Sequence, residues 1–374
     1  MKIVITSTNR SDLLDLLYKF LVLFYIFRGP AHMRACLLLW LCSVSGARGY
    51  DWVQGPSDIP APCPGLYCGR TDRGPGQNIT EDGLRYSACG PCERGWRVSS
   101  PGKSSVCQRC EDPIKLYDKL YLGFIVLFTL LAHWVSIDFT SNNPRKFTRE
   151  ILIVHASALV EVAIAAVVTL VLSEPLGEFT LTSCSVSRFS DWYTLLHNPS
   201  PNYEEKLYCT HEAVYPLYSI VFVFYALSLL LMIIFRPFLS SKFLPGRGRN
   251  AIYAALYFFP TFAIIHGVLG GIIYYSYPYI IIITSLMSCA AHYAFKLDQS
   301  IRSLLVTSLT DVRNLVILAG HWALHAYGIV AVTELKDINL HLSLIGLVPL
   351  PALFYILTAR FTHPDRITFQ YNEM

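Results

Sequence analysis

The chain has 374 residues, of which 15% are charged and 53% hydrophobic, and its formal net charge is +4. Soluble domains carry about 25% charged residues, so this chain has too few charges to cover a water-exposed surface. Together with a mean hydropathy of +0.42, this argues against a soluble enzyme, a disordered scaffold and a nucleic-acid binder.

The first part of the chain has the pattern of a secretory signal. Residues 33–47 combine a basic start, a short apolar stretch and small residues at the end, which predicts a signal peptide. Residues 1–32 are then an upstream extension without a folding role, and Met33 is a candidate start. The alternative is a single leader from Met1, in which Leu13–Phe27 acts as an anchor.

Residues 48–119 are polar and rich in Gly, Pro and Cys, which predicts a small cysteine-rich domain held together by disulfides. Asn78 begins an Asn-Ile-Thr glycosylation site, which fits a lumenal or extracellular segment. Six cysteines allow 15 pairings, and the sequence does not select one. The six cysteines are Cys63, Cys68, Cys89, Cys92, Cys107 and Cys110.

Two other kinds of site are compatible with the spacing of these cysteines. The spacing of Cys89 and Cys92 and of Cys107 and Cys110 approaches that of a four-thiolate zinc site. Cys89-Gly-Pro-Cys92 also matches a thioredoxin-type redox motif, but the sequence that follows does not supply the helix that this chemistry needs. On the oxidising side of a membrane, disulfides are favoured over both alternatives.

The rest of the chain, residues 120–360, predicts a transmembrane domain of seven helices. A bilayer core of about 30 Å needs about 20 apolar residues per helix. The seven apolar stretches are Leu120–Ile137, Ile151–Leu172, Tyr215–Phe235, Ala251–Ile273, Tyr279–Phe295, Leu315–Thr333 and Leu342–Ala359. The segment Tyr274–Pro278 predicts a tight interfacial turn between the fourth and fifth helices.

The positions of Lys and Arg predict the orientation, because cytosolic loops carry the excess of these residues. With the N-terminus outside, the outer loops hold only Arg188, Lys206 and Lys336. The inner side holds twelve, namely Arg145, Lys146, Arg149, Arg236, Lys242, Arg247, Arg249, Lys296, Arg302, Arg313, Arg360 and Arg366. The predicted N-terminus is therefore lumenal, and residues 361–374 form a cytosolic tail.

The longest outer loop, residues 173–214, contains Cys184 and Cys209. We expect these two cysteines to pair with each other and to tie the loop down. Its segments Ser190–Tyr193 and Asn198–Asn202 are typical of a structured lid.

Ionisable residues inside predicted spans are costly in lipid and are candidates for function. Glu161 lies near the middle of the second span, and His155 lies on the same span. At this depth Glu161 is either a transport or catalytic group or a protonated carboxyl that bonds a neighbouring helix. His321 and His325 are spaced i, i+4 on the sixth span and share one face, as a metal pair requires. These polar residues can serve interhelical packing alone. The alternative functions are a zinc hydrolase that uses the two histidines and a receptor or transporter that uses Glu161.

Several blocks of the chain resemble the c-Jun N-terminal kinase-associated membrane protein family. The resemblance runs from about Ala61 to Ile367 and follows the order of the seven spans. The blocks that carry it are Cys63–Gly69, Leu116–Phe124, Ser190–Pro201, Cys209–Tyr218, Ile252–Pro260, His321–Gly328 and Leu347–Tyr355.

The resemblance implies a non-enzymatic, multi-pass adaptor of the endoplasmic reticulum membrane, without a cofactor or metal. Its implied partners are proteasome subunits, ubiquitin ligases that act on misfolded proteins, the stress kinase in the family's name and membrane lipid, and not nucleic acid. The family's kinase-binding segment is placed at the cytosolic C-terminus, which is short in this chain.

Overall fold

The computed structural model describes residues 62–63, 66–72, 86–100, 104–139, 148–194, 209, 211–243, 248–294, 296 and 298–362. The predicted extension, the predicted signal peptide, Asn78 and nearly all of the predicted tail lie outside these residues. Within them, six segments are long and apolar enough to cross a membrane. The predicted all-α polytopic class with a disulfide-bonded N-terminal region is thus confirmed.

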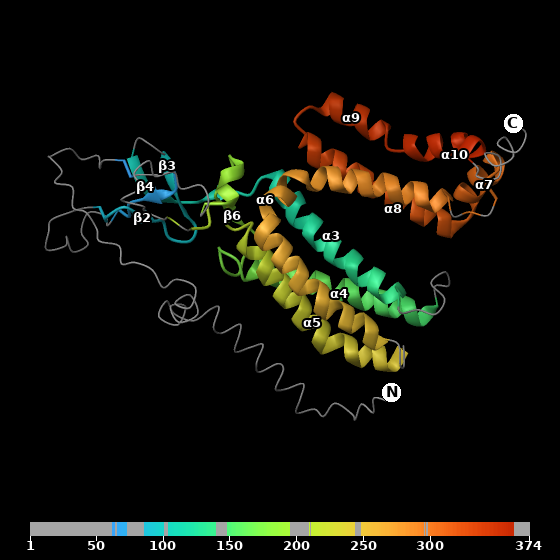
Figure 1. The fold of residues 1–374 in the computed structure, drawn as a ribbon, viewed down its shortest axis with the longest axis horizontal. Coiled ribbons are helices and arrows are strands. Elements are labelled where there is room, and N and C mark those ends of the chain that lie inside the picture. The colour runs from blue at the N-terminus through green and yellow to red at the C-terminus, as the bar shows by residue number, and fades with distance from the viewer. Residues whose placement is uncertain are drawn as a thin grey trace, which may run out of the picture. The chain divides into compact units, whose positions relative to one another are not determined.

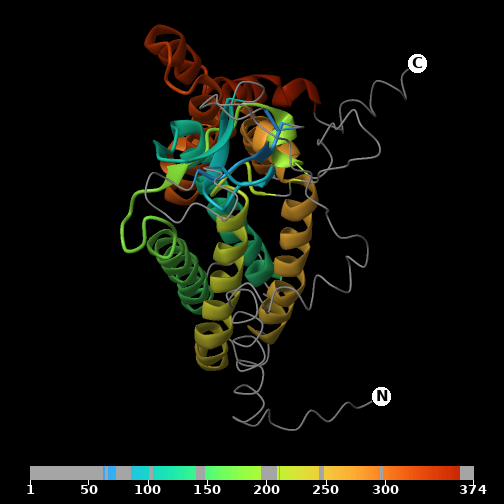
Figure 2. The ribbon, with the colours of Figure 1, turned by 90° about the vertical axis from the view of Figure 1, so that its left-hand side faces the viewer.

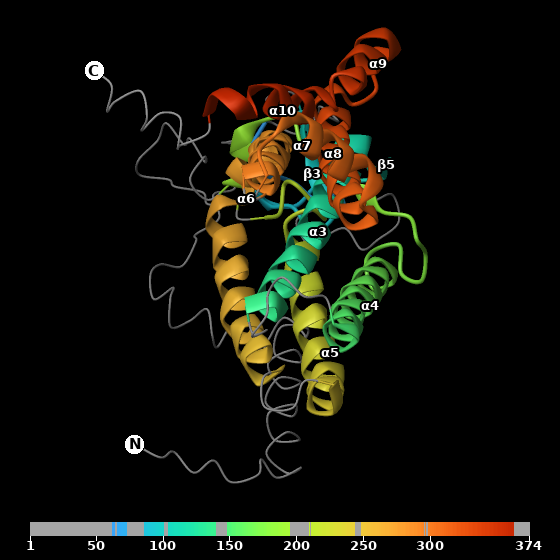
Figure 3. The same cartoon turned by 90° about the vertical axis from the view of Figure 1, so that its right-hand side faces the viewer.

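Four helical segments pack into one bundle. They are α3 (Leu116–Phe139), α4 (Arg149–Val171), α5 (Ser219–Phe243) and the first half of α6 (Gly248–Ala294), and each contacts the next, with α6 closing back on α3. Figure 3 shows α3, α4 and α5 of this bundle, and Figure 2 shows α5 in yellow beside the first half of α6 in orange. Buried side chains such as Tyr121 and Met232 form the core between them, which accounts for the first three predicted spans.

Helix α6 is continuous over 47 residues, so the prediction of a turn at Tyr274–Pro278 is wrong. At about 1.5 Å per residue its length is about 70 Å, roughly twice the thickness of a bilayer core, and it contains both the fourth and the fifth predicted spans. Figure 1 shows the ribbon of α6 changing direction near its middle. Pro278, in the second half of α6, cannot donate a helical hydrogen bond to the oxygen of Tyr274. The hydroxyl of Tyr117 donates to that oxygen instead, at 2.8 Å, so the chain continues as a helix.

The second half of α6 belongs to a second packing group with α7 (Ile301–Thr310), α8 (Val312–Thr333) and α10 (Leu350–Thr362). Its separate apolar core includes Tyr293, Leu304, Leu318 and Ile356. Helix α7 falls within a predicted inner loop, and Ser300 caps it by accepting a hydrogen bond from the amide of Ser303.

The seventh predicted span is divided into α9 (Ile338–Gly346) and α10. Pro349 explains the interruption, because a residue that precedes proline is disfavoured in the α conformation. Pro351 lies in the first turn of α10, where a missing amide costs little. Asp337 caps α9 by accepting bonds from the amides of Asn339 and Leu340.

The N-terminal disulfide-bonded region, defined here as the described residues between Cys63 and Pro113, contains short strands. Strand β1 (Cys68–Gly69) pairs with β2 (Gly90–Pro91), and β3 (Trp96–Ser100) pairs with β4 (Ser104–Arg109). Strand β5 (Asp112–Pro113) pairs with β6 (Thr182–Ser183) of the segment between α4 and α5. The chain thus brings the disulfide-bonded region back to the α4–α5 connection.

Candidate functional site

Four disulfides define the geometry of the disulfide-bonded region. Two lie within it, Cys63–Cys89 and Cys92–Cys107, and two reach the α4–α5 connection, Cys68–Cys209 and Cys110–Cys184. The expected pairing of Cys184 with Cys209 is therefore wrong. The β5–β6 pairing explains this, because it brings Cys110 and Cys184 to a Cα–Cα distance of 4.8 Å. Cys89 is bonded to Cys63 and Cys92 to Cys107. A redox pair would need Cys89 and Cys92 to bond each other, and a zinc site would need both to be free thiolates, so both alternatives are wrong.

A buried carboxylate fastens the same two segments together. Asp191 lies in the 3₁₀ helix η1 (Phe189–Trp192), and its side chain accepts hydrogen bonds from the Tyr67 hydroxyl at 2.9 Å and from the amides of Ser187 and Arg188. Arg97 of β3 forms an ion pair with it at 3.0 Å. No sequence motif indicated this cluster.

The protonation states of this cluster follow from burial and from these partners. Burial would raise the pKa of Asp191, but the Ser187 amide, the Arg97 charge and the other donors outweigh it and hold the pKa below its usual value. Burial raises the pKa of Tyr67 to about 12. At neutral pH the cluster is therefore an anionic carboxylate that accepts from a neutral phenol and a guanidinium.

The residue after Asp191 connects this cluster to the helices. The Trp192 side chain packs against the backbone of α6 at Gly270 and Gly271 and edge-on to Tyr121 of α3. A Cβ at Gly271 would lie 2.8 Å from side-chain atoms of Trp192 and Tyr193. Gly271 therefore leaves room on α6 for η1.

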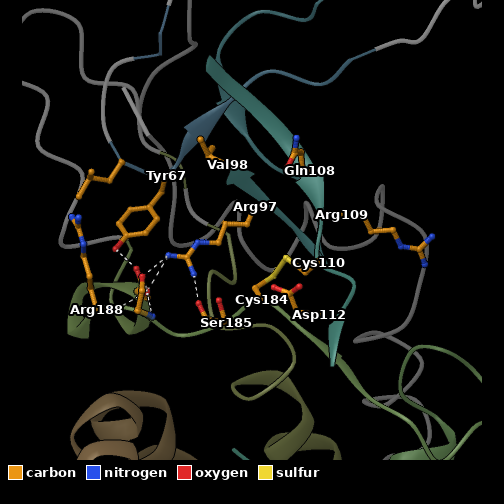
Figure 4. A pocket seen from close by; sticks show the side chains of 13 residues that line it. Tyr67, Arg97, Val98, Gln108, Arg109, Cys110, Asp112, Cys184, Ser185 and Arg188 are labelled. Atoms are coloured by element: carbon orange, nitrogen blue, oxygen red, sulfur yellow. Dashed lines mark hydrogen bonds and ion pairs between the residues drawn. A yellow bond between two sulfur atoms is a disulfide. The ribbon is translucent and has the colours of Figure 1, made fainter. Parts of the chain in front are cut away.

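A cleft of about 340 Å³ lies beside this cluster, between β3–β4 and the segment before η1. Figure 4 shows the Cys110–Cys184 disulfide and the Arg97 guanidinium together in this cleft. Arg97 also donates to the carbonyl oxygen of Ser185 at 2.7 Å. The lining residues are Leu66, Tyr67, Arg97, Val98, Gln108, Arg109, Cys110, Asp112, Cys184, Ser185, Ser187, Arg188 and Asp191.

A second polar cluster lies inside the helical bundle. Glu161 of α4 and Arg236 of α5 are both buried and form an ion pair at 2.5 Å. Ser157 donates to the other carboxylate oxygen, and a second guanidinium nitrogen of Arg236 bonds Nδ1 of His133 at 2.9 Å. The assignment of Arg236 to an inner loop is therefore wrong, because α5 continues past it to Phe243. Arg236 enters the bundle because Glu161 neutralises it there.

The remaining sequence candidates lie apart from this ion pair. His155 bonds the oxygen of Ile151 through Nδ1 and faces Asp138 at 3.1 Å through Nε2. His321 contacts the Ser288 hydroxyl of α6 at 3.0 Å, and His325 lies one turn further along α8. Among the residues that the structure describes, no group of three or more His, Cys, Asp or Glu side chains is placed to hold a metal ion.

Comparison with known proteins identifies relatives of the whole described region. The model of the JNK1/MAPK8-associated membrane protein family matches residues 63–364. The human and mouse JNK1/MAPK8-associated membrane proteins are each 43% identical to this chain over 316 residues, which cover 83% of this chain and 96% of each relative. A Caenorhabditis elegans homolog is 31% identical over 318 residues, which cover 82% and 95% of the two chains. No solved structure matches the chain. The match over nearly the full length of these relatives shows that the chain belongs to the JNK1/MAPK8-associated membrane protein family.

Proposed function

We propose that the chain is a non-enzymatic membrane adaptor that binds the c-Jun N-terminal stress kinase and prolongs its activity. We further propose that it recruits proteasome subunits and ubiquitin ligases to misfolded membrane proteins at the endoplasmic reticulum. The observation that carries the kinase proposal is the family match over residues 63–364, because the matched relatives are named for association with JNK1/MAPK8. The resemblance noted in the sequence supplies the degradation partners.

The proposed topology places the disulfide-bonded region in the lumen and the C-terminus in the cytosol. The Cys68–Cys209 and Cys110–Cys184 bonds support it, because they require both linked segments to lie on one side of the membrane. Disulfides persist in oxidising compartments, which favours the lumenal side. Moving Arg236 from the inner loops into the bundle leaves eleven inner Lys and Arg residues against three outer ones, so the positive-inside argument is unchanged.

An adaptor of this design presents short segments on a stiff helical frame. The proposed cytosolic connections are short, for example residues 140–148 between α3 and α4 and residues 244–247 between α5 and α6. The buried Glu161–Arg236 pair joins α4 to α5 within the bundle. Partners would therefore bind connections whose ends are fixed by buried contacts, together with the tail.

Co-purification from mild detergent tests the proposal. The full chain should bring down the kinase and proteasome subunits. Replacing residues 140–147, residues 244–247 or residues 363–374 by Gly and Ser, one segment at a time, should reduce recovery of one or both. The same replacement of outer residues 195–208 is the matched control and should leave recovery unchanged. If the full chain brought down neither the kinase nor proteasome subunits, the adaptor proposal would be wrong. If all three replacements retained full recovery of both partners, binding through these segments would be wrong.

A further inference from the structure

The Cys110–Cys184 disulfide differs in its surroundings from the others. It lines the cleft beside the Asp191 cluster, and Cys110 is only partly buried. Cys89 of the Cys63–Cys89 bond is also partly buried, so the cleft, and not burial alone, sets the Cys110–Cys184 bond apart. The Cys92–Cys107 bond, whose Cys107 lies in strand β4 shortly before Cys110, has both cysteines buried, at 4% and 5% exposure. A thiol that enters the cleft can therefore reach Cys110, whereas it cannot reach Cys107 without opening the hairpin.

The charges around the cleft favour a negatively charged reactant. Three guanidinium groups and two carboxylates line it, which leaves one net positive formal charge. The reactive form of a thiol in disulfide exchange is the thiolate anion. Arg97 donates to the carbonyl of Ser185, the residue that follows Cys184, and its guanidinium also pairs with Asp191, so a cation is fixed at the chain segment next to Cys184. The lining residues that carry these charges are Arg97, Arg109, Arg188, Asp112 and Asp191.

We propose that the Cys110–Cys184 disulfide is a thiol–disulfide exchange site that captures an incoming thiolate in this cleft. The thiolate attacks Sγ of Cys110 and forms a new S–S bond, while the Cys110–Cys184 bond breaks and its electron pair leaves on Sγ of Cys184. The reaction consumes no external oxidant or reductant. The product is a mixed disulfide at Cys110 and a thiolate at Cys184.

The fold keeps the capture reversible. Cys184 is 3% exposed, and the β5–β6 pairing of Asp112 with Ser183 and of Pro113 with Thr182 continues to hold its strand next to Cys110. The Cys184 thiolate can therefore attack Cys110 again, expel the captured thiol and restore the original bond. The Tyr67 and Arg97 contacts to Asp191 also remain in place, so opening this disulfide does not release η1.

The captured thiolate can come from a small molecule or from a cysteine side chain of a polypeptide. The cleft volume of about 340 Å³ is within the range of sites that hold small molecules, about 300–1,000 Å³. Glutathione and an extended peptide with a single cysteine are therefore the two probes. Mixed-disulfide formation with glutathione alone would identify a small-thiol site, and formation with the peptide would identify capture of polypeptides.

Redox titration of the purified full chain tests the site directly. The protein is equilibrated with mixtures of reduced and oxidised glutathione, free thiols are alkylated, and peptide mass spectrometry reports which cysteines have opened. Cys110 and Cys184 should become alkylated or glutathionylated at a less reducing ratio than Cys92 and Cys107, with a separation of about tenfold or more in the ratio. If Cys92–Cys107 opened together with or before Cys110–Cys184, the proposal would be overturned.

A pair of matched variants isolates the attacked sulfur. Cys184→Ser leaves Cys110 free in the cleft, and Cys92→Ser leaves Cys107 free in the buried hairpin. The probe is the disulfide-linked dimer of the single-cysteine peptide, which a free thiolate attacks with release of one peptide thiol. Cys110 should form the mixed disulfide with it about tenfold faster than Cys107. Equal rates would contradict the proposal. The wild-type titration tests the proposal even if either variant folds poorly. Neither measurement depends on kinase or proteasome binding, so it is independent of the proposed adaptor function.

Discussion

The hydroxyl group of Tyr117 donates a hydrogen bond to the main-chain oxygen of Tyr274, 2.8 Å away. This oxygen is the acceptor that the residue four positions later would use in a regular helix, and that residue is Pro278. Tyr277 returns a bond from its own hydroxyl to the main-chain oxygen of Tyr117 at 3.0 Å. The start of α3 thus replaces a missing helical bond in α6 and fixes the point where α6 passes from one packing group to the other.

Removing the Tyr117 hydroxyl should destabilise the protein. Tyr117→Phe leaves the Tyr274 oxygen without its side-chain donor, at an expected cost of about 1–3 kcal/mol. Thermal unfolding of the detergent-solubilised protein measures the change. In a Pro278→Ala background the restored amide can donate to the same oxygen, so the cost of Tyr117→Phe should fall to about half or less. An equal cost in both backgrounds would show that this hydrogen bond is not what Tyr117 contributes.

The Glu161–Arg236 pair predicts a strongly non-additive set of variants. Glu161→Gln leaves the buried guanidinium of Arg236 without a counter-charge, which should cost about 3–5 kcal/mol. The double variant Glu161→Met with Arg236→Met removes both charges and should be clearly more stable than either single charge removal. Glu150→Gln, at the exposed start of α4, is the control. Thermal unfolding in detergent measures wild type, Glu161→Gln, Glu161→Met, Arg236→Met, the double Met variant and Glu150→Gln. Additive effects of the two Met changes would contradict a direct pair.

The contact between Trp192 and α6 predicts a position-specific effect of a single methyl group. Gly271→Ala places a Cβ about 2.8 Å from Trp192 and Tyr193, so η1 must shift, at an expected cost of about 1–3 kcal/mol. Gly267→Ala is the control one turn earlier, where the nearest side-chain atom lies at 3.7 Å. Limited proteolysis between residues 185 and 215 should accelerate in the first variant alone. The same acceleration of proteolysis in both variants would mean that the effect comes from the change in helix propensity and not from the contact between Trp192 and α6.

His211 predicts a loss of stability in acid. Burial, and after it the positive charge of Arg97, lowers the pKa of His211 to about 4, against about 6.5 for an exposed imidazole. Between these values the unfolded chain binds a proton that the folded chain does not, so stability is present above about pH 6.5 and falls as the pH falls towards about 4. Among the described residues, neither ring nitrogen of His211 has a hydrogen-bond partner.

The measurement is the melting temperature of wild type and His211→Phe between pH 7.5 and 4.5. The wild-type value should decrease more over this range than that of the variant. Burial raises the pKa of the neighbouring Glu212, and protonation of this carboxyl acts in the opposite direction in both proteins. The difference between the two curves therefore isolates His211, and parallel curves would show that its protonation does not affect folding.

Hydropathy located the apolar segments because apolar length alone decides whether a segment can cross lipid, although the fourth and fifth predicted spans form the single helix α6 and the seventh is divided between α9 and α10. It did not predict the continuity of α6, because Pro278 normally ends a helix and the donor that compensates for it, Tyr117, lies 157 residues away from Tyr274. The location of Arg236 was missed for a similar reason. A lone arginine at the end of an apolar run indicates a loop unless its partner Glu161 is known to face it.

The cysteines show a different limit. Their number and compartment predicted a disulfide framework, but spacing along the chain carries no information on which sulfurs meet. The pairing of Cys110 with Cys184 depends on two-residue strands, β5 and β6, which are too short to leave a recognisable pattern. The Asp191 cluster likewise joins residues 67, 97 and 191, which are far apart in the sequence. No local sequence motif predicts it.

Protease digestion of sealed microsomes tests most directly whether the disulfide-bonded region and the proposed partner-binding segments lie on opposite sides of the membrane. The chain carries one epitope tag inserted between residues 195 and 208 and another after residue 374. Protease should remove the C-terminal tag while the outer-loop tag survives on a fragment that remains disulfide-linked to residues 63–110, and detergent should expose both tags. Loss of the outer-loop tag with survival of the C-terminal tag in intact microsomes would contradict the topology and the adaptor function that depends on it.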